Sequence, residues 1–175
     1  MIPANRFQAL LDQGKVILAD GAMGTMLHSR GASFDSSFDE LNLTQPALVA
    51  QIHSDYVEAG AQIIETNTFG ANRFKLSAHG LESQVMELNQ AAVRLARQAS
   101  DLSTEEILVA GSVGPLGVRL APFGRVKPEQ AFAAYCEQIA ALAEAGGAKV
   151  ASKTLLEGLA ALGHTLKIDK PEYEE

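Results

Sequence analysis

The feature that most constrains the fold is a regular alternation of short aliphatic runs and longer amphipathic segments. Three aliphatic runs, at residues 16–19, 62–65 and 107–110, recur at nearly constant spacing. Runs of this kind favour β-strands, whereas the segments between them repeat their apolar residues every three to four positions, as helices do. Strands that alternate with helices are typical of a parallel sheet covered by helices. The sequence therefore predicts an α/β fold.

Three helices are predicted from apolar faces of helical period. The first begins at Pro46, a residue type favoured in the first helical turn, and the others span residues 82–98 and 128–145. The first and third both end in Glu-Ala-Gly, at residues 58–60 and 144–146. Glycine at such an ending readily takes a left-handed backbone conformation, after which the chain can enter a strand. The second of these endings predicts a fourth strand near residues 148–152.

Composition and charge describe a soluble globular domain. The 175 residues are 47% hydrophobic and carry a net charge of -7. An acidic balance without a run of Lys or Arg argues against nucleic acid and anionic membranes as partners. The sequence contains no apolar stretch of roughly 18 residues, and its start lacks the features of a signal peptide. We therefore expect a cytoplasmic protein that binds neither nucleic acid nor a membrane.

Polar or glycine residues follow each predicted strand directly. They are Asp20 and Gly21 after the first strand, Glu65, Thr66, Asn67 and Thr68 after the second, and Ser112 after the third. Because the carboxyl ends of parallel strands share one edge of the sheet, we expect these residues to converge. Carboxylates suit an ammonium group, and backbone N–H groups at glycines can bind a carboxylate, so a small amino acid would match both. Alternatively, Asp20 and Thr66 cap helices and the glycines only turn the chain.

Other kinds of site find little support. The glycines lack the lysine of a phosphate loop and the spacing of a dinucleotide fingerprint. The four histidines are not spaced as metal ligands, and the single cysteine, Cys136, lies on the apolar face of its predicted helix, as a buried thiol does. The sequence therefore predicts no catalytic residue and no metal ligand in this chain.

Three stretches resemble one known family when they are taken together. They are ADGAMGTML (19–27), IIETNTFGANRFKL (63–76) and VAGSVGPLG (109–117). In this order and approximate spacing they resemble the homocysteine S-methyltransferase family, and most of all the homocysteine-binding N-terminal domain of the cobalamin-dependent methionine synthase type. The resemblance covers about residues 5–147. It implies that residues 1–147 form the N-terminal portion of a (β/α)8 TIM barrel, with three to four βα units.

The resemblance also implies an activity and a site. Members of the family transfer a methyl group to the thiol of homocysteine and so form methionine. By resemblance, Asp20 and Gly21 hold the amino-acid portion of homocysteine with the help of Thr66, while Glu65, Asn67 and Ser112 line the same mouth. The family holds zinc with three cysteines, and zinc lowers the pKa of the bound thiol. Cobalamin or a methylfolate would supply the methyl group.

This chain departs from the family pattern in two respects. Cys136 matches none of the three zinc ligands, and residues 148–175 form an atypical tail, predicted as a weak strand, a short helix at 154–162 and a charged end. We therefore expect a truncated, inactive methyltransferase domain without a cofactor of its own. The alternative is a non-catalytic module for amino-acid binding or assembly. Because an open portion of a barrel exposes sheet edges, we also expect a homodimer, a complementary barrel half or a covering tail helix.

Overall fold

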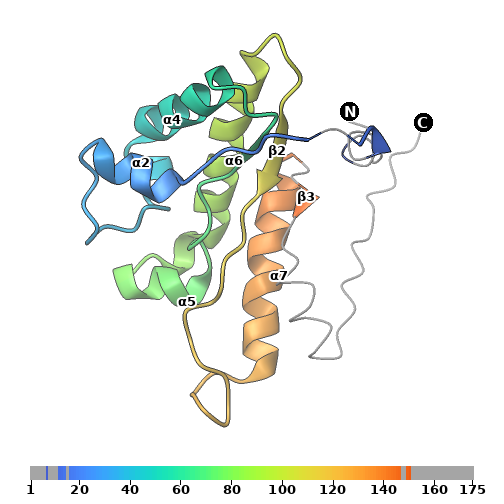
Figure 1. Ribbon diagram of the computed structural model, residues 1–175. Coiled ribbons are helices and arrows are strands. Elements are labelled where there is room, and N and C mark those ends of the chain that lie inside the picture. Colours follow the sequence, from blue (N-terminus) through green and yellow to red (C-terminus); the bar gives the residue numbers. More distant parts are fainter. Residues whose placement is uncertain (1–6, 8–11, 15, 147–148, 151–175) are drawn as a thin grey trace.

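The computed structural model describes residues 7, 12–14, 16–146 and 149–150 of the chain. These residues contain a parallel sheet of three strands, β1 (Ile63–Glu65), β2 (Leu108–Gly111) and β3 (Lys149–Val150), in the order β1-β2-β3. Each strand thus lies beside the next one in sequence, with helices between them (Figure 1). The predicted α/β fold is confirmed. The predicted tail helix at 154–162 and charged end lie outside the described residues.

The described helices include the three that the sequence predicts. They are α2 (Met23–Ser29), α3 (Leu41–Thr44), α4 (Pro46–Glu58), α5 (Arg73–Leu76), α6 (Val85–Asp101) and α7 (Pro128–Glu144), with 3-10 turns η1 (Ser77–His79) and η2 (Glu82–Gln84). The predictions correspond to α4, α6 and α7, and α6 begins at Val85 because the turn η2 occupies the three preceding residues. Gly60 and Gly146 take φ values of +99° and +135° just after α4 and α7, as predicted.

Helix α6 is the centre of the packing. It contacts α4 on one side and α7 on the other, and it also contacts β2. Figure 1 shows α6 and α7 side by side next to the strands. Val93 of α6 packs with Ile139 and Leu142 of α7, while Ala96 packs with Ile64 of β1. Burial of these apolar side chains stabilises the layer of helices against the sheet.

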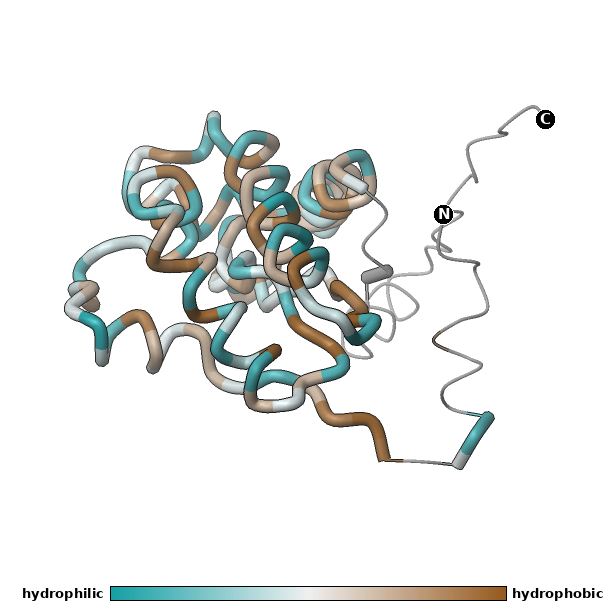
Figure 2. Tube along the Cα trace, turned by 90° about the horizontal axis from the view of Figure 1, so that it is seen from above, coloured by the Kyte–Doolittle hydropathy of each residue, from teal (hydrophilic) through white to brown (hydrophobic). Residues whose placement is uncertain are grey.

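The predicted strand at residues 16–19 is only partly formed. Its pairing with the rest of the described chain is an isolated bridge between Ala19 and Ile63, supported by a hydrogen bond of 2.9 Å from Asp20 N to Ile63 O. Val16 is 93% exposed, because no described strand covers the other side of this segment. Figure 2 shows the hydrophobic stretch at the margin of the described chain. The bridge still places Asp20 beside the end of β1.

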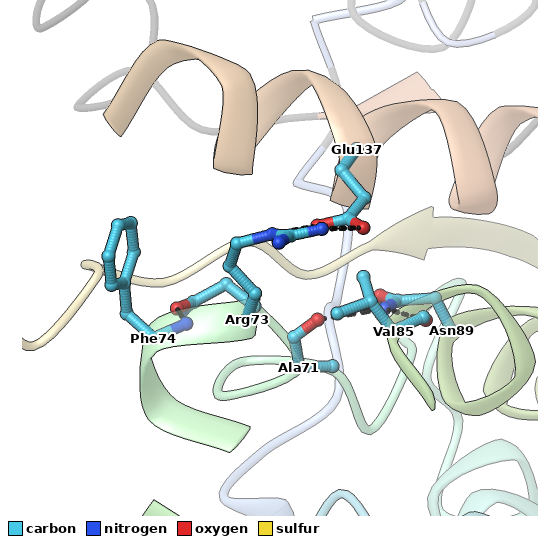
Figure 3. A network of polar contacts seen from close by, with 7 residues as sticks. Ala71, Arg73, Phe74, Val85, Asn89 and Glu137 are labelled. Atoms are coloured by element: carbon cyan, nitrogen blue, oxygen red, sulfur yellow. Dashed lines mark hydrogen bonds and ion pairs between the residues drawn. The ribbon is translucent and has the colours of Figure 1, made fainter. Parts of the chain in front are cut away.

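Polar contacts anchor the segment that follows β1. Arg73 Nε donates to Glu137 Oε2 of α7 over 2.7 Å, and Asn89 Nδ2 of α6 donates to Ala71 O over 2.8 Å. Figure 3 shows both contacts between the segment and the two helices. Asn72 caps α5 by accepting from the backbone N–H groups of Phe74 and Lys75. The loop after β1 is therefore held at its far end by α6 and α7.

One buried histidine gives a prediction about acid stability. His53 of α4 is fully buried, and neither ring nitrogen has a hydrogen-bond partner among the described residues. Burial lowers its pKa to about 4, so between pH 6.5 and 4 the unfolded chain binds a proton that the folded chain does not. The free energy of unfolding should therefore fall with acid over this range. We expect His53→Leu to raise that free energy by about 1–3 kcal/mol, with the larger gain at pH 5.

Urea unfolding at pH 5 and pH 7.5 measures the effect. The control is His79→Leu, the same chemical change at an exposed histidine, which should alter stability by less than about 0.5 kcal/mol. An equal gain for His53→Leu at both pH values would contradict the role given to protonation.

Candidate functional site

Hydrogen bonds join the three predicted polar clusters at the carboxyl end of the sheet. Asp20 Oδ2 accepts from Glu65 N over 2.9 Å, and Glu65 Oε2 accepts from Ser112 Oγ over 2.9 Å. The parallel register of β1 and β2 explains why Glu65 and Ser112 lie close together, because it pairs Glu65 with Ala110, two residues before Ser112. The structure thus brings together one residue from each cluster.

A cavity of about 850 Å³ opens at this edge of the sheet. All six residues proposed from the sequence line it, namely Asp20, Gly21, Glu65, Thr66, Asn67 and Ser112. Cavities of roughly 300–1,000 Å³ are typical of sites for small molecules. This one has room for an amino acid and for a second group beside it.

Two of the three carboxylates that line the cavity, Asp20 and Glu65, lie close to each other. Neither Asp20 nor Glu65 is ion-paired with a described residue. Burial raises the pKa of Asp20 to about 6, and the nearby charge of Glu65 raises this pKa as well. The hydrogen bond that Asp20 accepts from Glu65 N lowers the pKa in part. A cation placed between the two carboxylates would relieve this repulsion. The electrostatics at this end of the cavity therefore favour a positively charged ligand group, whereas Lys75 and His79 line the cavity near Asp39.

The alternative interpretation, that Asp20 and Thr66 cap helices, is wrong. The N-cap of α2 is Ala22, which makes no side-chain hydrogen bond, and the N-cap of α5 is Asn72. Asp20 instead accepts from the N–H of Glu65 on the neighbouring strand. Thr66 accepts from Ser112 N at the end of β2. Both side chains therefore connect strand ends.

Two of the proposed residues have close protein neighbours at the cavity wall. Asn67 Nδ2 donates to Phe38 O over 2.7 Å and to Asn42 Oδ1 over 3.2 Å, so both amide hydrogens are engaged within the protein. A Cβ atom at Gly21 would lie 2.9 Å from the hydroxyl of Tyr56. An alanine at position 21 would therefore require the Tyr56 side chain of α4 to shift.

Three residues that shape the site, Asp39, Thr68 and Gln138, were not proposed from the sequence. Asp39 lines the cavity and accepts from Gly70 N over 3.0 Å, but it lies in a long loop that offers no pattern to find it by. Thr68 belongs to the predicted cluster after β1 but was not proposed as a site residue, and Gln138 of α7 donates to Thr68 O over 2.8 Å. Gln138 could have been identified from the sequence, because it is a polar residue on the apolar face of the helix that includes Tyr135 and Leu142.

Asp39 gives a prediction about pH. Burial raises its pKa to about 6, although the Gly70 hydrogen bond, Lys75 and His79 lower it. The folded chain therefore holds this proton more tightly than the unfolded chain, and stability is lost as pH rises from about 4 to 6. We expect Asp39→Asn to raise the free energy of unfolding by about 1–2 kcal/mol at pH 7.5 and to give no gain at pH 4.

Asparagine keeps an oxygen that can accept from Gly70 N, which makes the variant a test of charge alone. Urea unfolding at the two pH values measures it. Asp55→Asn serves as control, because Arg30 holds the pKa of that exposed carboxyl below its usual range. A loss of stability in Asp39→Asn at pH 7.5 would refute the prediction.

Metal ligands do not gather in the described part of the chain. It contains no group of three or more His, Cys, Asp or Glu side chains placed to hold a metal ion. Cys136 lies half-buried on α7, where burial raises the pKa of its thiol and so disfavours the thiolate that binds metals. These residues do not fit a zinc site of three thiolates. None of the described helices is long and apolar enough to cross a membrane.

Parallel strands and a layer of helices define an α/β protein, and the cavity at its strand ends has the size typical of sites for small molecules. A family model described as homocysteine S-methyltransferase matches residues 17–164. The chain belongs to the homocysteine S-methyltransferase family. The resemblance carried by the three sequence stretches is thus confirmed, and the match continues past residue 147, at which the resemblance was taken to end.

Individual relatives agree with this assignment. The chain is 36% identical over 166 residues to a homocysteine S-methyltransferase from Escherichia coli (strain K12), covering 86% of this chain and 54% of that protein. It is 32% identical over 149 residues to a methionine synthase from Mycobacterium leprae (strain TN), covering 80% of this chain and 12% of that protein. The chain therefore spans about half the length of the first relative.

A solved structure shares the fold. The metallated form of the homocysteine methyltransferase MmuM from Escherichia coli superposes with a TM-score of 0.74 at 32% identity, covering 90% of this chain and 63% of that one. The apo form of the same protein gives a TM-score of 0.65. The described strands and helices thus match part of a larger structure.

Proposed function

We propose that this chain binds homocysteine in the cavity at the strand ends, as the homocysteine-binding part of a homocysteine S-methyltransferase. The observation that carries the proposal is that Asp20 and Glu65 share one cavity in a chain of this family and that neither carboxylate has an ion-pair partner among the described residues. A primary ammonium group supplies the missing positive charge and three N–H donors. Hydrogen bonds to charged groups of this kind contribute roughly 1.5–3 kcal/mol each.

The remaining parts of homocysteine would be placed by this first contact. With the ammonium group between Asp20 and Glu65, the carboxylate lies near the backbone of the Gly21 turn, which also lines the cavity. The thiol then extends into the rest of the cavity, where a methyl donor would meet it. In the reaction a bond forms between the thiolate sulfur and the methyl carbon, the bond from that carbon to the donor breaks, and methionine results.

The larger assembly is also part of the proposal. The strand order supports the N-terminal portion of a (β/α)8 barrel, and the exposed segment at 16–19 offers an edge for a complementary half or a second copy. With one cysteine in the chain, a zinc site of three cysteines would need residues outside it, and cobalamin or a methylfolate would supply the methyl group. In this view the chain alone is an inactive cytoplasmic protein. The same cysteine count favours the second candidate, a non-catalytic amino-acid-binding module.

Calorimetric titration of homocysteine into the purified chain tests the proposal. The matched control ligand is 4-mercaptobutyrate, which keeps the thiol and the carboxylate but lacks the ammonium group. We expect homocysteine to bind and the control ligand to bind at least tenfold more weakly. Equal affinity for both would refute ammonium recognition. Stoichiometric zinc together with methionine formation by the chain alone would refute the proposed lack of activity.

A further inference from the structure

A closed ring of hydrogen bonds joins the ends of β1 and β2. Ser112 N donates to Thr66 Oγ1 over 3.0 Å, Thr68 Oγ1 donates to Ser112 O over 2.7 Å, and the two threonine hydroxyls lie 2.6 Å apart. Thr66 and Thr68 are only 3% and 0% exposed. The ring continues the pairing of the two strands, whose last backbone bond runs from Thr66 N to Ala110 O.

The number of hydrogens sets the direction of every bond in this ring. A threonine hydroxyl carries one hydrogen, and a carbonyl oxygen can only accept. Because Thr68 uses its hydrogen on Ser112 O, the bond between the two hydroxyls must be donated by Thr66. Neither threonine then has a hydrogen left for a ligand.

Two further hydrogen bonds attach the ring to α7 and to the cavity wall. Gln138 of α7 is fully buried and donates to Thr68 O, so both the peptide and the side chain of Thr68 are held. On the cavity side, Ser112 uses its own hydroxyl hydrogen on Glu65 Oε2. The side chains of Ser112 and Glu65 therefore offer the cavity only hydrogen-bond acceptors.

We propose that Thr66 and Thr68 are positioning residues that hold Ser112 so that its hydroxyl aims the Glu65 carboxylate into the cavity. Because the side chains of Ser112 and Glu65 can then only accept hydrogen bonds from a ligand, they select a ligand with a cationic group that donates N–H hydrogen bonds. In place of the ligand contact inferred from the sequence, Thr66 acts through Ser112. The identity of the ligand rests on the proposed function, whereas the ring stands on its own contacts.

Two substitutions at Thr68 separate positioning from simple packing. Thr68→Val keeps the shape but removes the hydroxyl, which leaves Thr66 without an acceptor and Ser112 O without a donor. Thr68→Ser keeps the hydroxyl. We expect Thr68→Val to weaken homocysteine binding at least tenfold, and Thr68→Ser to bind within about threefold of the unaltered chain. Ile107→Ala, a core change just before β2 and at the opposite end of that strand from Ser112, controls for general destabilisation and should keep its affinity.

A second measurement, hydrogen exchange of one backbone amide, does not depend on ligand binding. The amide hydrogen of Ser112 should exchange slowly with solvent in the unliganded chain and in Thr68→Ser, and much faster in Thr68→Val. Rapid exchange of Ser112 in the unaltered chain would overturn the ring, as would unchanged affinity in a folded Thr68→Val variant. A protected Ser112 amide in a chain that binds no homocysteine would refute the proposed function alone.

Discussion

Replacing Asp20 with asparagine is expected to weaken homocysteine binding by roughly 10- to 150-fold, the equivalent of about 1.5–3 kcal/mol for a hydrogen bond to a charged group. Asparagine keeps an oxygen for the bond from Glu65 N, so the sheet edge stays joined while one negative charge is lost. Calorimetric titration at pH 7.5 gives the affinity directly.

The affinity for homocysteine should also depend on pH through Asp20. Since burial and Glu65 raise the pKa of Asp20 to about 6, the free chain takes up a proton there below pH 6. An ammonium ligand binds the ionised carboxylate, so its affinity should fall as the pH decreases through about 6, and this fall should be much smaller in Asp20→Asn. Asp101→Asn, at the exposed end of α6, is the control and should change neither quantity. The same pH profile in Asp20→Asn and in the unaltered chain would show that another group binds the ammonium.

Alanine at position 114 is expected to cost about 3 kcal/mol of folding free energy. An added Cβ would lie 2.4 Å from the carbonyl oxygen of Phe69 and 2.9 Å from its ring. The carbonyl belongs to the backbone of the loop after β1, so it cannot rotate away as a flexible side chain would. Relief requires the loops after β1 and β2 to separate, and these loops carry the cavity wall.

Urea unfolding compares this variant with Gly80→Ala. The alanine at position 80 would meet no atom within 4 Å, but its φ of +72° should cost about 1 kcal/mol through backbone strain alone. Equal losses in the two variants would mean that the contact with Phe69 relaxes easily. We also expect Gly114→Ala to bind homocysteine more weakly, because the loops would move apart.

The helices and the meeting of the strand ends could be predicted because they depend on local patterns. Apolar periodicity located α4, α6 and α7, and the parallel arrangement brought Asp20, Glu65 and Ser112 to one edge. The partners that complete the site come from far along the chain. Gln138 reaches Thr68 across 70 positions, and Asp39 reaches Gly70 from a loop without periodicity. Such contacts depend on tertiary packing, which no local spacing encodes.

The extent of the first strand could not be predicted for a related reason. The aliphatic run at 16–19 has the composition of a strand, but pairing needs a neighbour, and the described chain supplies one on a single side. Composition measures the tendency of a segment to pair, whereas the number of bonds it forms depends on what lies beside it.

The alternation along β1 has a consequence for insertions and deletions. Ile64 is fully buried among the helices, while Glu65, the next residue, lines the cavity. Successive side chains of a strand point to opposite faces. Adding or removing one residue within β1 would therefore turn the Glu65 carboxylate toward the apolar layer of helices and the Ile64 side chain toward the cavity. The strand should therefore tolerate many exchanges of one aliphatic residue for another, but no change in its length.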